Sequence, residues 1–254
     1  SHCFLAMYSA RLVSRHVRYL TKSTKIDTIR QSDPTTKYDF IPAEGRDKGD
    51  IVDVILKDFF TIEPHSRALG ITAETGGYFV DWLVSKCLKY PHSYRILHKS
   101  TGKLIGVRLM SAWERGSEDD FDIDIEQLDE NNRIIHTILG NLKEDFWRLR
   151  PEAQKVLRRE LSFVHSDHQR QGIAQHLVHL GLDYDLLRSK GFDGIMSEAS
   201  SIANQKLLLK NGYEILATTK QKEYIRSNGE PVIFPDETEA VKLVYFNLKK
   251  ASNA

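Results

Sequence analysis

The chain has 254 residues, of which 41% are apolar and 28% charged, so it can bury the core of one domain. Lysine and arginine total 36 against 35 for aspartate and glutamate, so no global field would attract nucleic acid or an anionic membrane. Cys3 and Cys87 stand far apart and outside any CxxC spacing. That pattern excludes a thiolate metal site and a disulfide framework, and it fits a reducing compartment.

The sequence also argues against a membrane span and a histidine metal site. No run of about 18 apolar residues occurs, so we expect no transmembrane helix. The histidine pairs His165 with His168 and His176 with His179 have i, i+3 spacing, but neither pair has a suitable third ligand nearby. We interpret them as surface or capping residues. The sequence therefore predicts no metal, no membrane partner and no nucleic-acid partner, and it leaves the oligomeric state open.

The N-terminus is basic. Between Met7 and Lys25 arginines and lysines alternate with serines and threonines, and no acid appears before Asp27. This composition is typical of a mitochondrial presequence, and an exposed basic helix ahead of the domain explains it equally well. We predict an N-terminal extension over residues 1–35, a domain over residues 36–254, and a cytoplasmic location with mitochondrial import as the alternative.

The first half of the domain mixes strand and helix patterns. Residues 38–42 are β-like, and a helical spacing of apolar residues follows from Gly49. A second helix is predicted over residues 74–90, where Pro91 ends it. Residues 93–98 and 104–113 then form a predicted antiparallel hairpin, because two β-rich runs flank a polar turn that contains glycine. An acidic stretch over 114–130 leads into a helix that ends before Pro151.

The second half alternates strands and helices more regularly. We predict strands and helices in this order: strand 155–165, helix 172–189, strand 194–198, helix 202–211 closed by Gly212, and strands 214–225 and 241–248. No internal repeat interrupts the pattern. The mixed order indicates an α/β or α+β fold with a single sheet flanked by helices.

One strand-turn-helix segment, residues 161–174, carries chemical information. The backbone N–H groups of Gln169 to Ala174 are predicted to be unpaired at the positive end of a helix, where a phosphate would bind. The small residues Gly172 and Ala174 would let an anion approach the backbone closely. The alternative is a glycine kept for packing, as in many α/β proteins.

The spacing Gln169-x-x-Gly172-x-Ala174, five residues after Val164, resembles the signature of the GNAT superfamily of N-acyltransferases. That resemblance implies a GNAT-like fold, in which one mixed, mostly antiparallel sheet is splayed at the acetyl-CoA site. It implies acetyl-CoA as the cosubstrate, with its pyrophosphate on the turn and its pantetheine arm along the preceding strand. The implied cofactor-binding residues are Phe163, Val164, His165, Gln169, Arg170, Gln171, Gly172, Ile173, Ala174 and Asn204.

Two further stretches extend the resemblance. Residues 199–213 look like the second cofactor segment of that superfamily, in which an asparagine, here Asn204, lies near the thioester. Residues 58–70, with Phe59-Phe60-Thr61-Ile62-Glu63-Pro64, are similar to the invertebrate arylalkylamine N-acetyltransferases, and shorter matches occur at 102–107 and 236–244. This narrower resemblance implies acetylation of a small primary amine, an arylalkylamine.

Such a reaction needs a base, because an alkylamine with a pKa near 10.4 is almost entirely protonated at neutral pH. Glu63 is the first candidate, since it matches the glutamate assigned as base in the resembling group; the alternative is a helix-terminal glutamate without a partner. Glu160 is the second candidate, and strand alternation would place it on one side with Ser162 and Val164 until a bulge intervenes. For Glu160 the alternative is a salt bridge with Arg158 or Arg159.

The other catalytic candidates are Ser200 and Asn204, which would hold a water chain or polarise the acetyl carbonyl, unless such groups merely cap the following helix. Leu208 stands where many superfamily members carry a tyrosine that reprotonates the thiolate, so no general acid is assigned. We expect an acceptor pocket built from the Glu63 region, residues 76–82, residues 110–113 and Tyr224.

Two rival functions stay open from the sequence. One is an N-acetyltransferase for a polyamine, an amino acid, or a peptide lysine or N-terminus. The other is a non-catalytic acetyl-CoA-binding sensor that keeps the fold and lacks the chemistry, against which the presence of both Glu63 and Glu160 argues.

Overall fold

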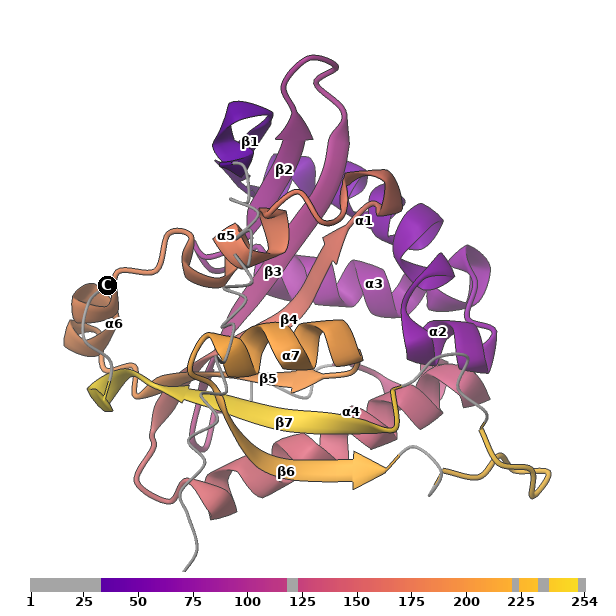
Figure 1. The fold of residues 1–254 in the computed structure, drawn as a ribbon. Helices are drawn as coiled ribbons and strands as arrows, with labels where there is room; N and C mark the ends of the chain where they lie inside the picture. Colours follow the sequence, from indigo (N-terminus) through magenta and orange to yellow (C-terminus); the bar gives the residue numbers. More distant parts are fainter. Residues whose placement is uncertain (1–32, 118–122, 221–223, 233–237, 251–254) are drawn as a thin grey trace, which may run out of the picture. The chain divides into compact units, whose positions relative to one another are not determined.

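A computed structural model describes residues 33–117, 123–220, 224–232 and 238–250. The predicted N-terminal extension lies outside these residues, except for its last three positions. Residues 118–122 of the acidic stretch and the sequence match at Asp236 and Glu237 also lie outside them. The described strands form one sheet in the order β1-β2-β3-β4-β5-β7-β6 (Figure 1). These strands are β1 (Tyr38–Pro42), β2 (Tyr94–His98), β3 (Leu104–Glu114), β4 (Lys155–Val164), β5 (Gly194–Ala199), β6 (Glu214–Lys220) and β7 (Ala240–Asn247).

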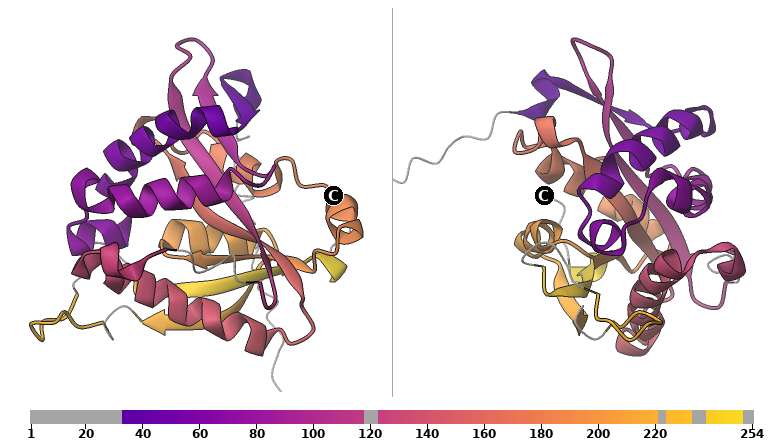
Figure 2. Two further views of the ribbon diagram at one scale, coloured as in Figure 1. Left: turned by 180° about the vertical axis from the view of Figure 1, so that it is seen from behind. Right: turned by 90° about the vertical axis from the view of Figure 1, so that its right-hand side faces the viewer.

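Helices cover both faces of the sheet. The described helices are α1 (Lys48–Asp58), α2 (Pro64–Leu69), α3 (Ala73–Cys87), α4 (Glu130–Leu149), α5 (Ile173–His179), α6 (Tyr184–Ser189) and α7 (Ile202–Lys210). Buried side chains of α1, α3 and α4 pack on one face and those of α5, α6 and α7 on the other. The two views of Figure 2 show helices on both sides of the sheet. The predicted single mixed, mostly antiparallel sheet flanked by helices is confirmed.

The sheet opens between β4 and β5. Among the described strands these two form the parallel pair, and their register runs only from Val156 opposite Gly194 to Arg158 opposite Met196. Beyond that point β4 continues to Val164 paired with β3 alone, while β5 stays paired with β7. The splay implied by the superfamily resemblance is therefore present, and the backbone edge of β4 beyond Arg158 faces an opening.

A bulge lies in β4 at the start of this opening. The β3–β4 register shifts between Leu109, opposite Leu161, and Met110, opposite Arg159, so Glu160 is the extra residue. The bulge puts Glu160 on the same face as Leu161, which packs with α1 and α3, and turns Ser162 away to an exposed position. The predicted common side for Glu160, Ser162 and Val164 is thus interrupted by the bulge.

The helix predicted over residues 172–189 is wrong, because the structure contains two helices there, α5 and α6. Gly181 breaks the segment with φ +63, and a Cβ at that position would lie 2.1 Å from the Tyr94 hydroxyl. The packing of Tyr94 in β2 against Gly181 therefore overrides the helical pattern of apolar residues in this segment. The short helix α2 was not predicted, and it ends at Gly70 with φ +64.

Two buried arginines hold the C-terminal end of α5 from the sheet side. Arg108 of β3 donates to the carbonyl oxygen of Leu177 at 2.6 Å, and Arg159 of β4 donates to the carbonyls of Leu177 and Val178. Arg159 also donates to the hydroxyl of Tyr213 at 2.9 Å. Cations at a helix C-terminus satisfy its last carbonyls and complement its dipole, so α5 is fixed on the sheet.

Candidate functional site

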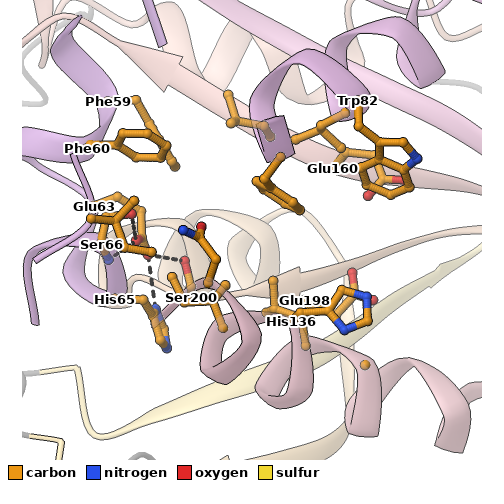
Figure 3. A pocket seen from close by; sticks show the side chains of 18 of the residues that line it. Phe59, Phe60, Glu63, His65, Ser66, Trp82, His136, Glu160, Glu198 and Ser200 are labelled. Atoms are coloured by element: carbon orange, nitrogen blue, oxygen red, sulfur yellow. Dashed lines mark hydrogen bonds and ion pairs between the residues drawn. The ribbon is translucent and has the colours of Figure 1, made fainter. Parts of the chain in front are cut away.

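A cavity of about 150 Å³ lies on the face of the sheet covered by α3 and α4. Apolar and aromatic side chains form most of its wall, including Phe59, Phe60, Phe79, Trp82 and Leu83. Polar side chains project into it at both ends (Figure 3). Glu63, Ser66, His65 and Ser200 gather at one end, and Glu160, Glu198 and His136 lie toward the other.

Glu63 is the N-cap of α2, and four donors hold its carboxylate. Ser66 donates its backbone N–H at 2.7 Å and its hydroxyl at 2.8 Å to Oε2. His65 Nδ1 lies 3.0 Å from Oε1, and the Ser200 hydroxyl donates to the same oxygen at 2.9 Å. Burial alone would raise the pKa of Glu63, but the bonds from His65 and Ser66 outweigh it and lower the pKa to about 2. The carboxylate is therefore ionised over the whole physiological range, and the alternative of a partnerless helix-terminal glutamate is wrong.

Ser200 and Asn204, the paired candidates from the sequence, separate in the structure. Ser200 meets Glu63 across 137 residues of chain. Asn204 lies in the first turn of α7, where its backbone N–H bonds the hydroxyl of Ser201 at 3.3 Å, and it is not among the residues that line the cavity. The capping alternative therefore applies to Ser201, and the structure does not bring Asn204 together with Glu63.

Glu160 is buried in a charged cluster at the other end of the cavity. Its Oε1 accepts from the Ser111 hydroxyl at 2.5 Å and lies 3.2 Å from Lys86 Nζ and 3.4 Å from Arg158 Nη1. The predicted salt bridge with Arg158 is therefore present, although the same carboxylate still lines the cavity.

Glu198 is a site residue that sequence reasoning missed. It lies on β5, its side chain is 6% exposed, and Arg158 Nη2 lies 3.2 Å from its Oε1. Burial raises the pKa of Glu198, Arg158 opposes this, and the neighbouring Glu160 adds to it. The signal that could have found it is strand alternation, because Glu198 precedes Ser200 by two residues and shares its face.

The predicted anion-binding turn precedes α5. Arg170 and Gly172 have positive φ angles of 60° and 82°. Within the described residues, the backbone N–H groups of Arg170 through Ala174 have no hydrogen-bond partner. The Gln169 side chain folds back and donates to the carbonyl of Val164 at 3.1 Å. The turn therefore presents a concave row of free amides, as such a backbone conformation does in anion-binding nests.

The strand residues expected along the pantetheine arm differ in the direction of their backbone groups. Phe163 is buried against Phe59, with ring centroids 6.1 Å apart, and the N–H of His165 is taken by the carbonyl of Ile105 at 2.8 Å. Because backbone groups alternate along an antiparallel strand, Ser162 and Val164 direct theirs toward the opening. Of the three predicted residues, Val164 thus turns its backbone groups toward the opening, as Ser162 does, whereas those of Phe163 and His165 point toward β3.

The predicted acceptor pocket is only partly correct. Phe79 and Trp82 line the cavity. Tyr78 is 38% exposed, and its hydroxyl accepts from the N–H of Asp124. Residues 110–113 and Tyr224 do not line this cavity, because Met110 faces the core under α5 and α6 and Tyr224 borders a separate hollow beside α4.

Leu208 is buried in the core with 1% exposure, and Cys87 is buried as a free thiol. In the part of the chain that the structure describes, no set of three or more histidine, cysteine or acidic side chains is placed to hold a metal. None of the described helices has the length and apolarity that a bilayer span would require.

Comparison with known proteins gives a result for structure only. No family model matches the chain, and no curated protein matches it in sequence. The fold is similar to arylalkylamine N-acetyltransferase 2 from Aedes aegypti, with a TM-score of 0.71, 17% identity and coverage of 83% of this chain and 99% of the other. It is similar to a Drosophila melanogaster polyamine N-acetyltransferase that forms N-acetylagmatine, with a TM-score of 0.68, 14% identity and the same coverages.

A third similar structure is the C-terminal condensation domain of Ebony in complex with β-alanyl-dopamine, with a TM-score of 0.60, 18% identity and coverages of 83% and 99%. At such identities the comparisons establish the fold. That fold is the one implied by the turn signature at Gln169, Gly172 and Ala174.

Proposed function

We propose that this chain is an acetyl-CoA-dependent N-acetyltransferase that acetylates a small primary amine. One observation carries the proposal: the free amides of the turn and the amine-sized cavity lie along the same strand, β4, on either side of its opening from β5. A cosubstrate with a phosphate at one end and a reactive acyl group at the other needs such an arrangement. The shared fold with N-acetyltransferases supports the same conclusion.

The residues present fit coenzyme A. The amides from Arg170 to Ala174 are unpartnered donors for a pyrophosphate. The backbone groups of Ser162 and the N–H of Val164 on the open edge of β4 can bond the amides of a pantetheine arm as an added strand would, beside the Val164 carbonyl that already accepts from Gln169. When bound, acetyl-CoA supplies an activated acyl group, and the protein supplies the orientation of the amine and a place for its proton.

A pocket glutamate is proposed as the base. Glu63 and Glu160, the two carboxylates expected from the sequence, both border the cavity. The pKa of Glu63 is lowered to about 2, so its carboxylate is charged at neutral pH beside the Ser200 hydroxyl. It can therefore attract the ammonium form of the acceptor. Its ionised state and its position support a direct role in the reaction.

The acceptor is proposed to be an arylalkylamine. Phe60, Phe79 and Trp82 give the cavity aromatic walls, and Phe79 and Trp82 lie 5.9 Å apart between ring centroids. An aryl ring gains about 0.5–1.5 kcal/mol per aromatic contact beyond the area that it buries. The names of similar structures include both arylalkylamine and polyamine enzymes, so a polyamine acceptor is the second candidate.

The test is thioester consumption by the purified protein with a panel of amines, followed by release of the free thiol. We expect turnover with tyramine, dopamine or serotonin. A protein that binds coenzyme A but consumes no thioester with any amine would be the sensor of the alternative reading, and one that neither binds nor turns over would contradict the proposal altogether.

A further inference from the structure

The cavity has two polar ends, and the function proposed above places the amine at the end formed by Glu63. Ser200, which bonds Glu63, follows directly after β5 and lies beyond Met196, where the pairing of β5 with β4 stops. This end therefore borders the opening through which an acyl group would enter. The remainder of the acceptor would extend toward the other end, where Glu160 and His136 lie (Figure 3).

The helix α4 forms one long wall of the cavity. Its lining residues lie three or four positions apart, as one face of a helix requires: Asn132, Ile135, His136, Leu139, Gly140 and Lys143. At about 1.5 Å of rise per residue, this stripe extends over roughly 16 Å. His136 lies about one turn after Asn132 and about two turns before Lys143. An acceptor that is held by its amine at Glu63 and extends along α4 would therefore reach His136.

His136 differs from the other polar side chains of the cavity wall. No described residue forms a hydrogen bond with its half-buried imidazole. By contrast, Asn132 donates to the carbonyl of Thr75 at 3.0 Å, and the Lys143 ammonium lies over the ring of Trp113. The carboxylates of the wall have the donors described above. Among the described lining residues, the imidazole is thus the polar group that can take a ligand without giving up a bond.

The protonation state of His136 indicates which ligand group would complement it. Burial lowers the pKa of His136, and the nearby Lys143 lowers it further, so the imidazole is neutral at neutral pH. A neutral imidazole has one N–H donor and one acceptor nitrogen. A hydroxyl group can donate to the one and accept from the other, whereas an ammonium group can only donate.

The charges at this end of the cavity argue against a second ammonium group in the acceptor. Three cations lie around two carboxylates there, namely Lys86, Lys143 and Arg158 around Glu160 and Glu198. A further cation would meet net repulsion in partly buried surroundings. A hydroxyl group carries no charge and avoids that cost.

We propose that His136 selects acceptor amines that carry a hydroxyl group on the aryl ring, at the end opposite to the amine; this inference rests on the function proposed above. The ring lies among the aromatic side chains of α3 that line the cavity, and its hydroxyl forms a hydrogen bond with the imidazole. The amine stays at Glu63 and Ser200, so His136 takes no part in the transfer of the acyl group or of the proton.

The test compares tyramine with phenethylamine, which differ by the ring hydroxyl alone. We expect the wild type to prefer tyramine by about tenfold in kcat/KM, as one neutral hydrogen bond would give. His136→Phe keeps a ring of similar shape and removes both nitrogens. It should lower kcat/KM for tyramine about tenfold, through a higher KM, and change the value for phenethylamine by less than about threefold.

Three further variants control this comparison. Thr137→Val alters the next residue of α4, an exposed threonine whose hydroxyl donates to the Arg133 carbonyl at 2.8 Å, and should leave the preference for tyramine unchanged. His136→Gln keeps one donor and one acceptor on the side chain and should restore part of the preference. His136→Leu, a smaller apolar replacement, serves the same purpose as His136→Phe if the latter does not fold.

Three outcomes would overturn the inference: equal kcat/KM of the wild type for the two amines, equal losses for both amines in His136→Phe or His136→Leu, or full retention of the preference in these variants. A failure of the proposed function looks different, because the wild type would then acetylate neither amine.

Discussion

Glu63 shows how one side chain can serve the fold and the site together. Its carboxylate caps α2 through Ser66, and it also bonds His65 and Ser200. Since these donors favour the charged form, protonating Glu63 costs free energy that the fold must supply. The residue that attracts the acceptor ammonium in our proposal is thus also a stabilising element of the cavity wall.

We expect Glu63→Gln to destabilise the protein, by on the order of 3 kcal/mol at neutral pH, because the pKa falls from 4.5 to about 2 on folding. A lowered pKa gives stability that is present above the unfolded pKa and is lost as the pH falls through the folded one. The difference between the wild type and the variant should therefore shrink as the pH drops from about 4.5 toward about 2. Urea denaturation at several pH values measures it, and a pH-independent difference would contradict this account.

At the scale of elements, the loop before α5 and the helix α3 each depend on glycine. The loop depends on the positive φ of Gly172, and α3 depends on the close approach of Gly76 to the Phe60 ring, where a Cβ would lie 2.3 Å from Cε2. Gly77, the next residue, has open space around its Cβ position. The two positions give separate tests of the cofactor side and the acceptor side.

On the cofactor side, we expect Gly172→Val to abolish the stabilisation by coenzyme A, because a β-branched residue is strained at φ 82° and would displace the free amides. For the wild type the stabilisation should reach about 2.7 kcal/mol at a hundredfold excess over Kd. Gly191→Val is the control, since it has the same φ of 82° between α6 and β5. It should lower stability and keep the coenzyme A shift, which thermal unfolding with and without the ligand can measure. An unchanged shift in Gly172→Val would place the phosphate site elsewhere.

On the acceptor side, Gly76→Ala and Gly77→Ala should have opposite effects. The first forces the Phe60 ring to move within the cavity wall, so we expect a loss of about 1–3 kcal/mol and a higher KM for the amine. The second adds a good helix former without a clash, so we expect a gain of about 0.5–1 kcal/mol and an unchanged KM. Equal stability changes in the two variants would show that Phe60 does not confine Gly76.

The sequence predicted helices and strands correctly where a periodic pattern of apolar residues extends along a whole segment. The strands β1 to β5 and the helices α1, α3, α4 and α7 lie where their patterns predict them, within a few residues. The sequence did not predict the helix break at Gly181, because that break depends on Tyr94, a residue distant in sequence. The helix α2 was not predicted because its six residues contain less than two turns of a helical apolar pattern.

The sequence predicted the site residues that belong to a recognisable motif. It did not predict the residues that only the folded topology brings into the site. The turn at Gln169 to Ala174 follows from family-like spacing, and so do Glu63 and Ser200 as separate candidates, whereas their hydrogen bond was not predicted. Glu198 belongs to no motif, and its place in the cavity wall depends on where β4 and β5 separate. Asn204 does not line the cavity, and its backbone N–H bonds the hydroxyl of Ser201, the N-cap of α7.

At the scale of the whole molecule, the sheet separates two tasks. The face under α5, α6 and α7 carries the turn and the packing of its helix, and the face under α3 and α4 carries the cavity. The carboxylates of the cavity come from α2, β4 and β5, so its charge pattern depends on the complete fold. The choice of acceptor amine therefore depends on the whole fold. We expect the aromatic side chains of the cavity wall to determine which amine is preferred.

We expect aryl amines such as tyramine or serotonin to exceed spermidine and a lysine peptide by at least about tenfold in kcat/KM. One or two aromatic contacts of about 0.5–1.5 kcal/mol each account for that ratio. A long polycation would need a lining of free acids, whereas Glu160 and Glu198 share Arg158. Steady-state kinetics with the three classes of amine measure the ranking. If spermidine or the peptide leads, the acceptor class is wrong, although acetyl transfer itself would stand.

The arginines beneath α5 limit how far the binding loop could be transplanted by protein engineering. A graft of residues 164–174 onto another sheet would carry the backbone amides, but it would leave behind Arg108 and Arg159, which hold the carbonyls of Leu177 and Val178. Without them a helix of seven residues has too little of its own stability to orient a loop. The smallest portable unit is therefore the strand pair β3 and β4 together with α5, and not the loop alone.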